Sequence, residues 1–154
     1  MLSFSQVKSA GSAGNYYTEK DNYYVIGSME ERWQGKGAEL LGLEGKVDKQ
    51  VFTELLQGKL PDGSALTRIQ DGVNKHRPGY DLTFSAPKSV SMLAMLGGDK
   101  RLIDAHNRAV TVALNQVESL ASTRVKKDGV SETVLTGNLI IARFNHDTSR
   151  AQDP

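Results

Sequence analysis

Apolar and polar positions change their period several times along the chain, and each period predicts a different kind of element. Residues 2–8 alternate, with Leu2 and Phe4 apolar, as in a short strand with one buried face. Residues 80–84 alternate in the same way, and residues 139–144 form a strongly apolar run. These three segments are the strands that the pattern predicts most clearly.

Helical spacing predicts three helices in the stretches between the strands. Residues 48–58 begin with Asp48 as N-cap, and Gly58 suits the position just beyond a helix end. Residues 88–96 follow Pro87, a residue that favours helix entry. Asp99 caps a long helix that we expect to reach Ser122. Its expected buried face is an apolar stripe made of Leu102, His106, Ala109, Val110, Ala113, Val117 and Leu120.

Turn signals complete the outline. Residues 124–135, with Lys127-Asp128-Gly129 in the middle, predict a hairpin. Residues 58–79 predict a loop region with a short helical turn around 65–69. Because the strands do not alternate regularly with helices, the expected fold is α+β, with a mainly antiparallel central sheet covered by helices.

Composition narrows the class of protein. The chain has 154 residues, which suits one domain. It contains no cysteine, which excludes a disulfide framework, a thiolate zinc site and a cysteine nucleophile. Lys and Arg number 19 against 18 Asp and Glu, so no polybasic tail or membrane anchor is present. Without an apolar run of membrane-spanning length or a secretory signal, we expect a soluble globular domain.

Four tyrosines, Tyr16, Tyr17, Tyr23 and Tyr24, lie within nine residues of one another. Their residue type alone leaves three interpretations open. The rings could pack in the core with their hydroxyls at the surface, or form a stacking platform for single-stranded bases. A phenol can also act as a nucleophile when a base or a metal assists it.

Two further residues are candidates for chemistry. His146 ends an apolar strand, although one imidazole alone does not make a metal site. Asp81 could be an exposed or capping carboxylate, or it could orient a metal-binding histidine. His106 falls on the apolar helix stripe, where a packed or partly exposed histidine is the ordinary interpretation. Gly11 and Gly14 lack the Gly-Lys-Ser/Thr of a phosphate loop.

Taken together, several segments closely resemble the start of conjugative relaxases of the plasmid TraI/TrwC type, the MobF branch of the HUH endonucleases. The resemblance runs from the first residue to the last. The segments that carry it are Met1-Leu2-Ser3, residues 9–17 (Ser-Ala-Gly-Ser-Ala-Gly-Asn-Tyr-Tyr), Tyr23-Tyr24, residues 76–91 (His-Arg-Pro-Gly-Tyr-Asp-Leu-Thr-Phe-Ser-Ala-Pro-Lys-Ser-Val-Ser) and residues 144–150 (Phe-Asn-His-Asp-Thr-Ser-Arg).

The resemblance implies a relaxase-type fold and a DNA strand transferase that nicks one strand of a plasmid transfer origin. By match of position, Tyr16 is the nucleophile that forms a 5′-phosphotyrosine, with Tyr17 beside it. Tyr23 and Tyr24 match the pair thought to serve a later transfer. Asp81 matches the carboxylate that orients a histidine, and His146 matches the first of three histidine ligands.

The resemblance also implies a divalent metal, Mg²⁺ or Mn²⁺, and single-stranded origin DNA as partner. Arg77 and Arg150 are the cations expected to contact that DNA. The same resemblance implies two kinds of protein partner: relaxosome accessory proteins and a coupling protein of the conjugative secretion system. It also implies that the protein is located in the cytoplasm of the bacterial donor cell and is transferred to the recipient.

In the resembled family a His-x-His pair follows the first histidine by about a dozen residues, and this sequence ends at Pro154. Residues 1–154 are therefore expected to be the N-terminal portion of a relaxase domain, without the helicase portion and inactive alone. The alternatives are a rolling-circle replication initiator and a fragment that binds single-stranded DNA without cleaving it.

Overall fold

The structure is a computed structural model, and it describes residues 2–8, 31–65, 69–70, 73–74 and 78–145. These residues form helices α2 (Lys36–Leu40), α3 (Lys49–Leu56), α4 (Lys88–Met95) and α5 (Lys100–Ser119). The strands are β1 (Leu2–Val7), β2 (Glu31–Gln34), β3 (Ile69–Gln70), β4 (Val73–Asn74), β5 (Gly79–Phe84), β6 (Ser122–Lys127), β7 (Val130–Leu135) and β8 (Ile141–Phe144).

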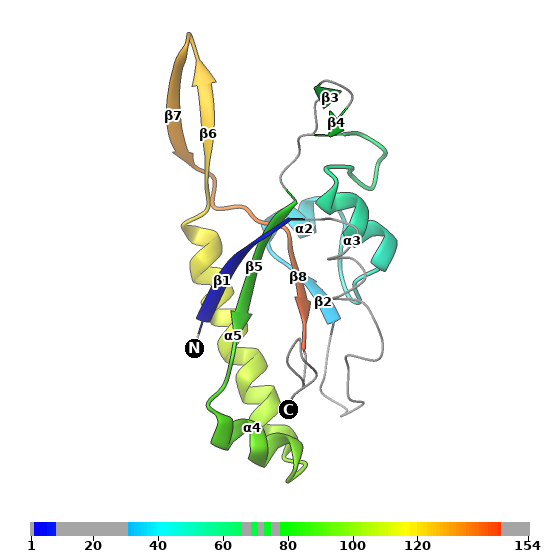
Figure 1. Cartoon of the computed structure of the whole chain (residues 1–154), viewed down its shortest axis with the longest axis vertical. Coiled ribbons are helices and arrows are strands. Elements are labelled where there is room, and N and C mark those ends of the chain that lie inside the picture. Colours follow the sequence, from blue (N-terminus) through cyan, green and yellow to red (C-terminus); the bar gives the residue numbers. More distant parts are fainter. Residues whose placement is uncertain (1, 9–30, 66–68, 71–72, 75–77, 146–154) are drawn as a thin grey trace.

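Every strand pair in the described part of the chain is antiparallel, which confirms the expected α+β class. The strands form four two-stranded ladders, β1–β5, β2–β8, β3–β4 and β6–β7. Figure 1 shows β1–β5 and β2–β8 in the middle of the molecule, with α2 and α3 on one side and the long helix α5 on the other. The ladders between these helices position the candidate site.

Helix α3 forms where its sequence predicts it. The Asp48 carboxylate accepts a hydrogen bond from the backbone N–H of Val51 at 3.0 Å, and Gly58 follows the C-cap with φ of +85°. The helix buries Phe52 in a core cluster with residues from β2, α2 and the loop before α3: Trp33, Ala38 and Val47. The ring of Phe144 on β8 packs edge-on against Phe52 with centroids 5.2 Å apart. This apolar cluster therefore fixes one face of the β2–β8 ladder.

Helix α4 begins and ends at its predicted signals, and α5 begins at its predicted cap. Pro87 is the N-cap of α4, and Gly98 leaves the turn after it with φ of +64°. The Asp99 carboxylate caps α5 by accepting from the backbone N–H of Arg101 at 3.1 Å. Helix α5 ends at Ser119, three residues earlier than predicted, because Ser122 already belongs to β6.

The predicted buried face of α5 is wrong by about one residue position. The buried side chains of α5 are Ile103, Leu114 and Glu118, whereas Leu120 is 74% exposed. The apolar stripe lies beside this face because the side of α5 that meets β2 and β8 carries polar groups, which the hydrophobic pattern cannot identify.

The buried carboxylate of Glu118 is stabilised by two backbone hydrogen bonds. Its Oε2 atom accepts hydrogen bonds from the backbone N–H groups of Lys36, at 2.8 Å, and Leu139, at 3.0 Å. Gly35 allows this approach, since a Cβ there would lie 2.4 Å from the carbonyl oxygen of Leu139 and 2.7 Å from Glu118 Oε2. One buried carboxylate thus joins the start of α2, the segment before β8 and the end of α5.

Four elements were not predicted, namely β2, α2, β3 and β4, and the helical turn expected around residues 65–69 is a further incorrect prediction. Strand β2 reads Glu-Arg-Trp-Gln, and α2 follows a glycine, so neither has a clear periodic pattern. The expected helical turn around 65–69 is not helical in its described residues. Ala65 forms a bridge with Lys59, and Ile69 lies in β3.

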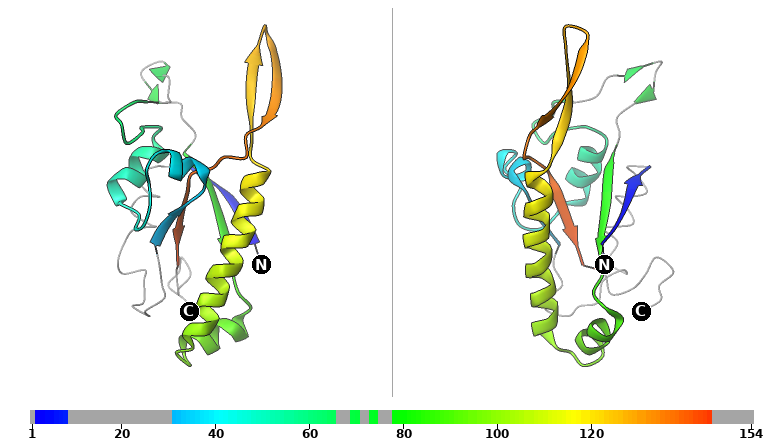
Figure 2. Two further views of the ribbon diagram at one scale, coloured as in Figure 1. Left: turned by 180° about the vertical axis from the view of Figure 1, so that it is seen from behind. Right: turned by 90° about the vertical axis from the view of Figure 1, so that its left-hand side faces the viewer.

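The hairpin predicted at 124–135 is present as β6–β7. Asp128 and Gly129 both have positive φ, +53° and +80°, as a two-residue turn that matches the twist of the strands requires. All side chains of both strands are exposed, and Figures 1 and 2 show the hairpin projecting beyond the C-terminal end of α5. The helices in the described part of the chain are too short or too polar to cross a membrane.

We predict that Glu118→Ala destabilises the protein by about 2–6 kcal/mol, because two partly buried backbone N–H groups lose their acceptor at roughly 1–3 kcal/mol each. Glu118→Gln keeps an acceptor oxygen and should lose less. Glu132→Ala, on the exposed strand β7, is the control and should lie within about 0.5 kcal/mol of the parent. Urea unfolding measures all three. Equal stabilities for Glu118→Ala and Glu132→Ala would contradict the role given to Glu118.

Candidate active site

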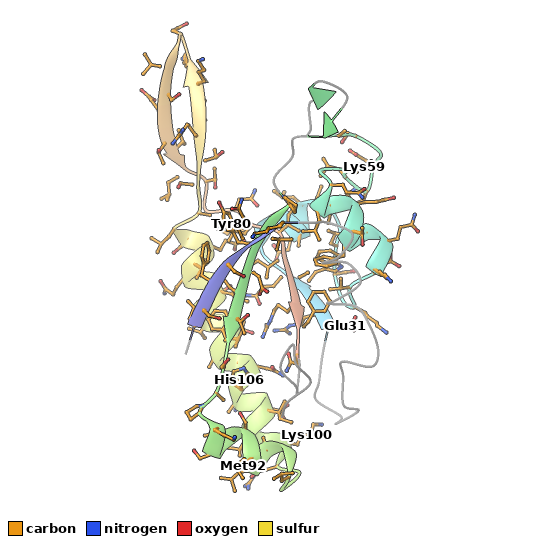
Figure 3. All side chains as sticks on the ribbon, viewed as in Figure 1. Glu31, Lys59, Tyr80, Met92, Lys100 and His106 are labelled. Atoms are coloured by element: carbon orange, nitrogen blue, oxygen red, sulfur yellow. The ribbon has the colours of Figure 1, made fainter. Side chains whose placement is uncertain are left out.

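The β1–β5 ladder has one apolar and one polar face. Because side chains alternate along a strand, Phe4 and Tyr80 share the first face, where their rings stack with centroids 5.0 Å apart. Figure 3 labels Tyr80 on this ladder. The second face carries Asp81 and Thr83, with Ser5 directly across from Asp81. A carboxylate and hydroxyl groups therefore gather on one side of the ladder.

Asp81 is held by both the backbone and a side chain. Its strand pairs with β1 at six consecutive positions, from Gly79 opposite Val7 to Phe84 opposite Leu2. Thr83 Oγ1 donates to Asp81 Oδ1 at 3.2 Å, and the carboxylate is half-buried. A fixed, partly accessible carboxylate can orient the N–H of an imidazole, as the resemblance implies for Asp81.

The end of β8 lies against α5 through polar contacts. Arg143 is only 8% exposed, and its guanidinium donates to Thr111 Oγ1 at 2.6 Å, Gln34 Oε1 at 2.9 Å and the carbonyl oxygen of Asn107 at 2.9 Å. One residue beyond the end of the strand, Asn145 Nδ2 donates to Asn107 Oδ1 at 2.7 Å. These contacts fasten the last residues of β8 before the position of His146.

Strand β2 also forms hydrogen bonds with the polar side of α5. Arg32 Nη2 donates to Thr111 Oγ1 at 2.9 Å, so this hydroxyl accepts from two arginines and donates its own proton to the Asn107 carbonyl at 3.0 Å. Both acceptor sites and the one donor of the hydroxyl are in use. We name this group the α5 polar cluster; it consists of Arg32, Gln34, Asn107, Thr111, Arg143 and Asn145.

His106 lies on α5 next to this cluster (Figure 3). Burial lowers the pKa of its imidazole, and the positive charge of Arg143 lowers that pKa further. Both effects favour the neutral imidazole, and the half-buried side chain agrees with the packed or partly exposed histidine expected on this helix.

Of the residues predicted for the site, the structure describes Asp81. The other predicted residues lie outside the described ranges: Tyr16, Tyr17, Tyr23, Tyr24, Arg77, His146 and Arg150. Within the described ranges no three His, Asp or Glu side chains gather where a metal ion could bind.

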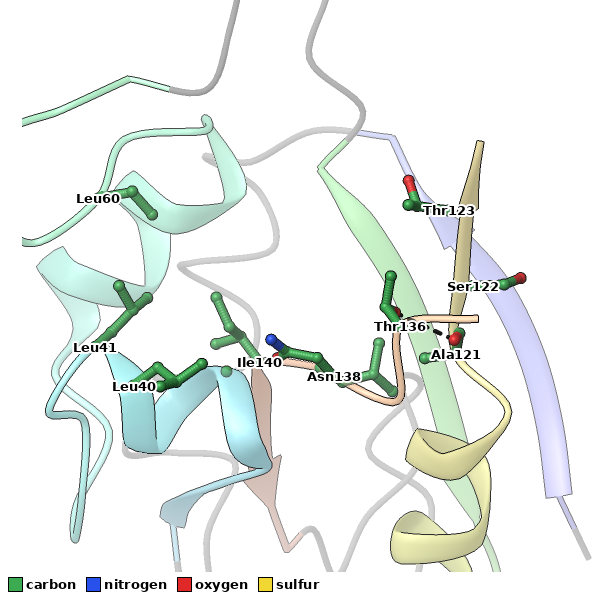
Figure 4. Close-up of a pocket in the computed structure, with 11 residues that line it drawn as sticks. Leu40, Leu41, Leu60, Ala121, Ser122, Thr123, Thr136, Asn138 and Ile140 are labelled. Carbon is green, nitrogen blue, oxygen red and sulfur yellow. Dashed lines mark hydrogen bonds between the residues drawn. The ribbon is translucent and has the colours of Figure 1, made fainter. Parts of the chain in front are cut away.

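A groove of about 480 Å³ lies away from this chemistry, between α2 and the foot of the β6–β7 hairpin (Figure 4). Its wall contains no titratable side chain, so it offers no general acid or base. The lining residues are Gly37, Leu40, Leu41, Leu60, Ala121, Ser122, Thr123, Thr136, Asn138, Leu139 and Ile140. On the hairpin side of the groove, Thr136 Oγ1 donates to the carbonyl oxygen of Ala121 at 3.1 Å.

Sequence reasoning missed the α5 polar cluster, although two signals for it exist. Arg143 interrupts an otherwise apolar run, and a charge inside a buried strand requires polar partners. Asn107 and Thr111 stand four residues apart, so they share one helix face, and Glu118 continues that face seven residues later. Polar residues at helical spacing indicate a buried polar face when a nearby strand carries the complementary group.

Comparison with known proteins places the chain in a family. The family model described as TrwC relaxase matches residues 10–154. The multifunctional conjugation protein TraI of Escherichia coli is 79% identical over all 154 residues, and TraI of strain K12 is 76% identical. The chain spans 9% of the length of each of these relatives.

Solved structures agree. The conjugative relaxase TrwC in complex with oriT DNA, in a metal-bound form, superposes with a TM-score of 0.85 at 44% identity, over all of this chain and 53% of that one. TrwC with a 27-mer DNA comprising the recognition hairpin and the cleavage site gives 0.82 at 42% identity, over all of this chain and 52% of that one. The copper-bound structure of TrwC with oriT DNA superposes with a TM-score of 0.86 at 45% identity, over all of this chain and 54% of that one. The match of the family model over almost the whole chain shows that this protein belongs to the TrwC relaxase family.

Proposed function

We propose that the protein containing this chain nicks one strand of a plasmid transfer origin and retains the cut end as a phosphotyrosine. The observation that carries the proposal is the match along the entire chain to TrwC, which was solved with origin DNA. The E. coli relatives are named conjugation proteins, which supports the same role. Residues 1–154 then form the N-terminal portion of a relaxase domain.

The proposed reaction is a transesterification. The Tyr16 oxygen forms a bond to the scissile phosphorus, and the bond from phosphorus to the 3′ oxygen breaks. The phenol loses its proton and the leaving 3′ oxygen gains one, so the strand ends in a free 3′ hydroxyl. Because one phosphodiester replaces another, the step can run backward to rejoin the strand. Tyr17 lies beside the nucleophile, and Tyr23 and Tyr24 serve a later transfer.

An ordinary tyrosine has a pKa near 10, so Tyr16 needs help to attack at neutral pH. His146 would supply one imidazole ligand to a divalent cation, and Asp81 a carboxylate that can accept the other N–H of a ligating ring; the two remaining imidazoles would come from the His-x-His pair that the resemblance implies. Mg²⁺ or Mn²⁺, when bound, would polarise the phosphate oxygens and offset developing negative charge. The metal-bound TrwC structures support a metal in this role.

The proposed partner is single-stranded origin DNA. Arg77 and Arg150 would contact its phosphates, so binding should weaken as salt rises. The proposed protein partners are relaxosome accessory proteins and a conjugative coupling protein. A helicase portion would belong to the same polypeptide. The proposed location is the cytoplasm of the donor cell.

We predict that Tyr16→Phe in the full-length protein abolishes the covalent adduct with a labelled origin oligonucleotide. The substitution removes the attacking oxygen and almost no packing volume, so single-strand affinity should change less than about threefold. A denaturing gel detects the adduct, and a binding titration measures the affinity.

Tyr17→Phe is the matched control and should keep the adduct. If Tyr16→Phe formed the adduct at the parental level, the nucleophile would be another tyrosine. If the parent itself bound the oligonucleotide without any adduct, it would be a DNA-binding protein that does not cleave.

We further predict that Asp81→Ala raises the Mn²⁺ concentration needed for half-maximal nicking by about 10–100-fold, the usual effect of losing a carboxylate that orients a metal ligand. The unfolding midpoint should change little, because Asp81 is only half-buried. Ser3→Ala, on the same face of the β1–β5 ladder, is the control. An unchanged metal requirement in Asp81→Ala would remove Asp81 from the site.

A further inference from the structure

The β6–β7 hairpin adds no buried side chain to the described part of the chain. Every residue of both strands is exposed, and the ribbon projects away from the central ladders, beyond the C-terminal end of α5 (Figures 1 and 2). An isolated two-stranded hairpin is only marginally stable in water. A ribbon of this kind, paired at six consecutive positions and burying no core, is explained by a binding role.

The pairing of the two strands sorts their side chains onto two faces. Residues directly opposite each other share a face, and neighbours along a strand lie on opposite faces. Arg124 lies opposite Thr133, and Lys126 lies opposite Ser131, so a hydroxyl stands across from each cation. We name this side of the hairpin the basic face; it consists of Ser122, Arg124, Lys126, Ser131, Thr133 and Leu135.

The two carboxylates of the hairpin lie off the basic face. Glu132 is opposite Val125 on the other face, and Asp128 lies in the turn. Among the residues that the structure describes, no salt bridge involves Arg124 or Lys126. The whole chain has a net charge of only +1, so the positive charge of this face comes from the local sorting of side chains.

Alternating cations and hydroxyls match a phosphate backbone. Side chains of Arg, Lys, Ser and Thr make many of the contacts between proteins and DNA phosphates, and these contacts do not read the bases. Arg124 and Lys126 stand two residues apart on an extended strand, roughly 7 Å along it, so they can contact separate phosphates. The basic face therefore offers two cationic contacts to a polyanion.

We propose that the basic face of the β6–β7 hairpin binds the sugar–phosphate backbone of origin DNA at a distance from the scissile phosphate. Strand β5, which carries Asp81, lies in the middle of the molecule, whereas the hairpin extends away from it (Figure 1). The contact adds affinity without base specificity and takes no part in the chemical step. The inference rests on the proposed function, because it takes DNA to be the partner.

The test is a fluorescence titration of a labelled origin oligonucleotide with the full-length protein at several salt concentrations. The double variant Arg124→Gln/Lys126→Gln removes two charges and keeps polar side chains. Its slope of log affinity against log salt concentration should become shallower by about 1.4–1.8, since each phosphate contact contributes about 0.7–0.9. An oligonucleotide of scrambled sequence should show the same change, and the rate of adduct formation at saturating DNA should stay parental.

Two single variants form a matched pair. Lys126→Gln and Lys127→Gln each remove one positive charge from neighbouring positions of the same strand. Lys127 lies opposite Val130, on the other face of the hairpin. Lys126→Gln should lose about half of the change in slope seen in the double variant, and Lys127→Gln should keep the parental slope.

A parental slope in the double variant would overturn the inference and leave the proposed function standing. Equal changes in Lys126→Gln and Lys127→Gln would also overturn it, because the effect would then follow net charge and not the face. A change confined to the origin sequence would contradict backbone binding. If the parent formed no covalent adduct, the proposed function would fail, and the salt slopes would still decide whether the basic face binds DNA.

Discussion

The buried charge of Arg143 is the constraint on which the centre of the structure depends. A guanidinium that is 8% exposed must have its N–H groups paired, because an unpaired buried charge costs several kcal/mol. Gln34, Thr111 and the carbonyl of Asn107 supply acceptors from β2 and α5. This pairing fixes the register of β8, since a slip by one residue would turn the Arg143 side chain to the opposite face of the ladder.

Two ladders then contribute to the site by different means. The β1–β5 ladder presents Asp81 through strand pairing and the Thr83 hydroxyl, on the polar face opposite the stacked rings of Phe4 and Tyr80. The β2–β8 ladder is held between the apolar cluster around Phe52 and the α5 polar cluster. The proposed chemistry needs a carboxylate from the first ladder and a histidine that follows the second, so both ladders must keep their positions.

Local signals in the sequence were sufficient for most element boundaries. Asp48, Asp99 and Gly58 act as caps whose chemistry is confined to one turn, and Asp128-Gly129 specifies its own hairpin turn. Helix caps and tight turns of this kind can be recognised from a few neighbouring residues, without the rest of the fold. Asp81 could be singled out only through the resemblance, because its residue type and place in a strand permit an ordinary surface role.

The parts that could not be predicted depend on contacts between distant segments. Glu118 is buried because it accepts from Lys36 and Leu139, 82 and 21 residues away, so no periodic pattern marks it as interior. Strand β2 has polar side chains because Arg32 and Gln34 face polar groups of α5, and a hydrophobic pattern therefore overlooks it. The four tyrosines and His146 lie outside the described residues, so the roles predicted for them stay predictions.

Hydrogen exchange in Thr111→Val tests most directly whether the α5 polar cluster holds the β2–β8 ladder. Valine keeps the shape of threonine but removes the hydroxyl shared by Arg32 and Arg143, a loss on the order of 1.5–3 kcal/mol for bonds to charged groups. The backbone amides of β8 should exchange about tenfold faster or more, while those of the β6–β7 hairpin keep their parental rates. Unchanged exchange in β8 would show that the strand is held without the cluster and would contradict this account.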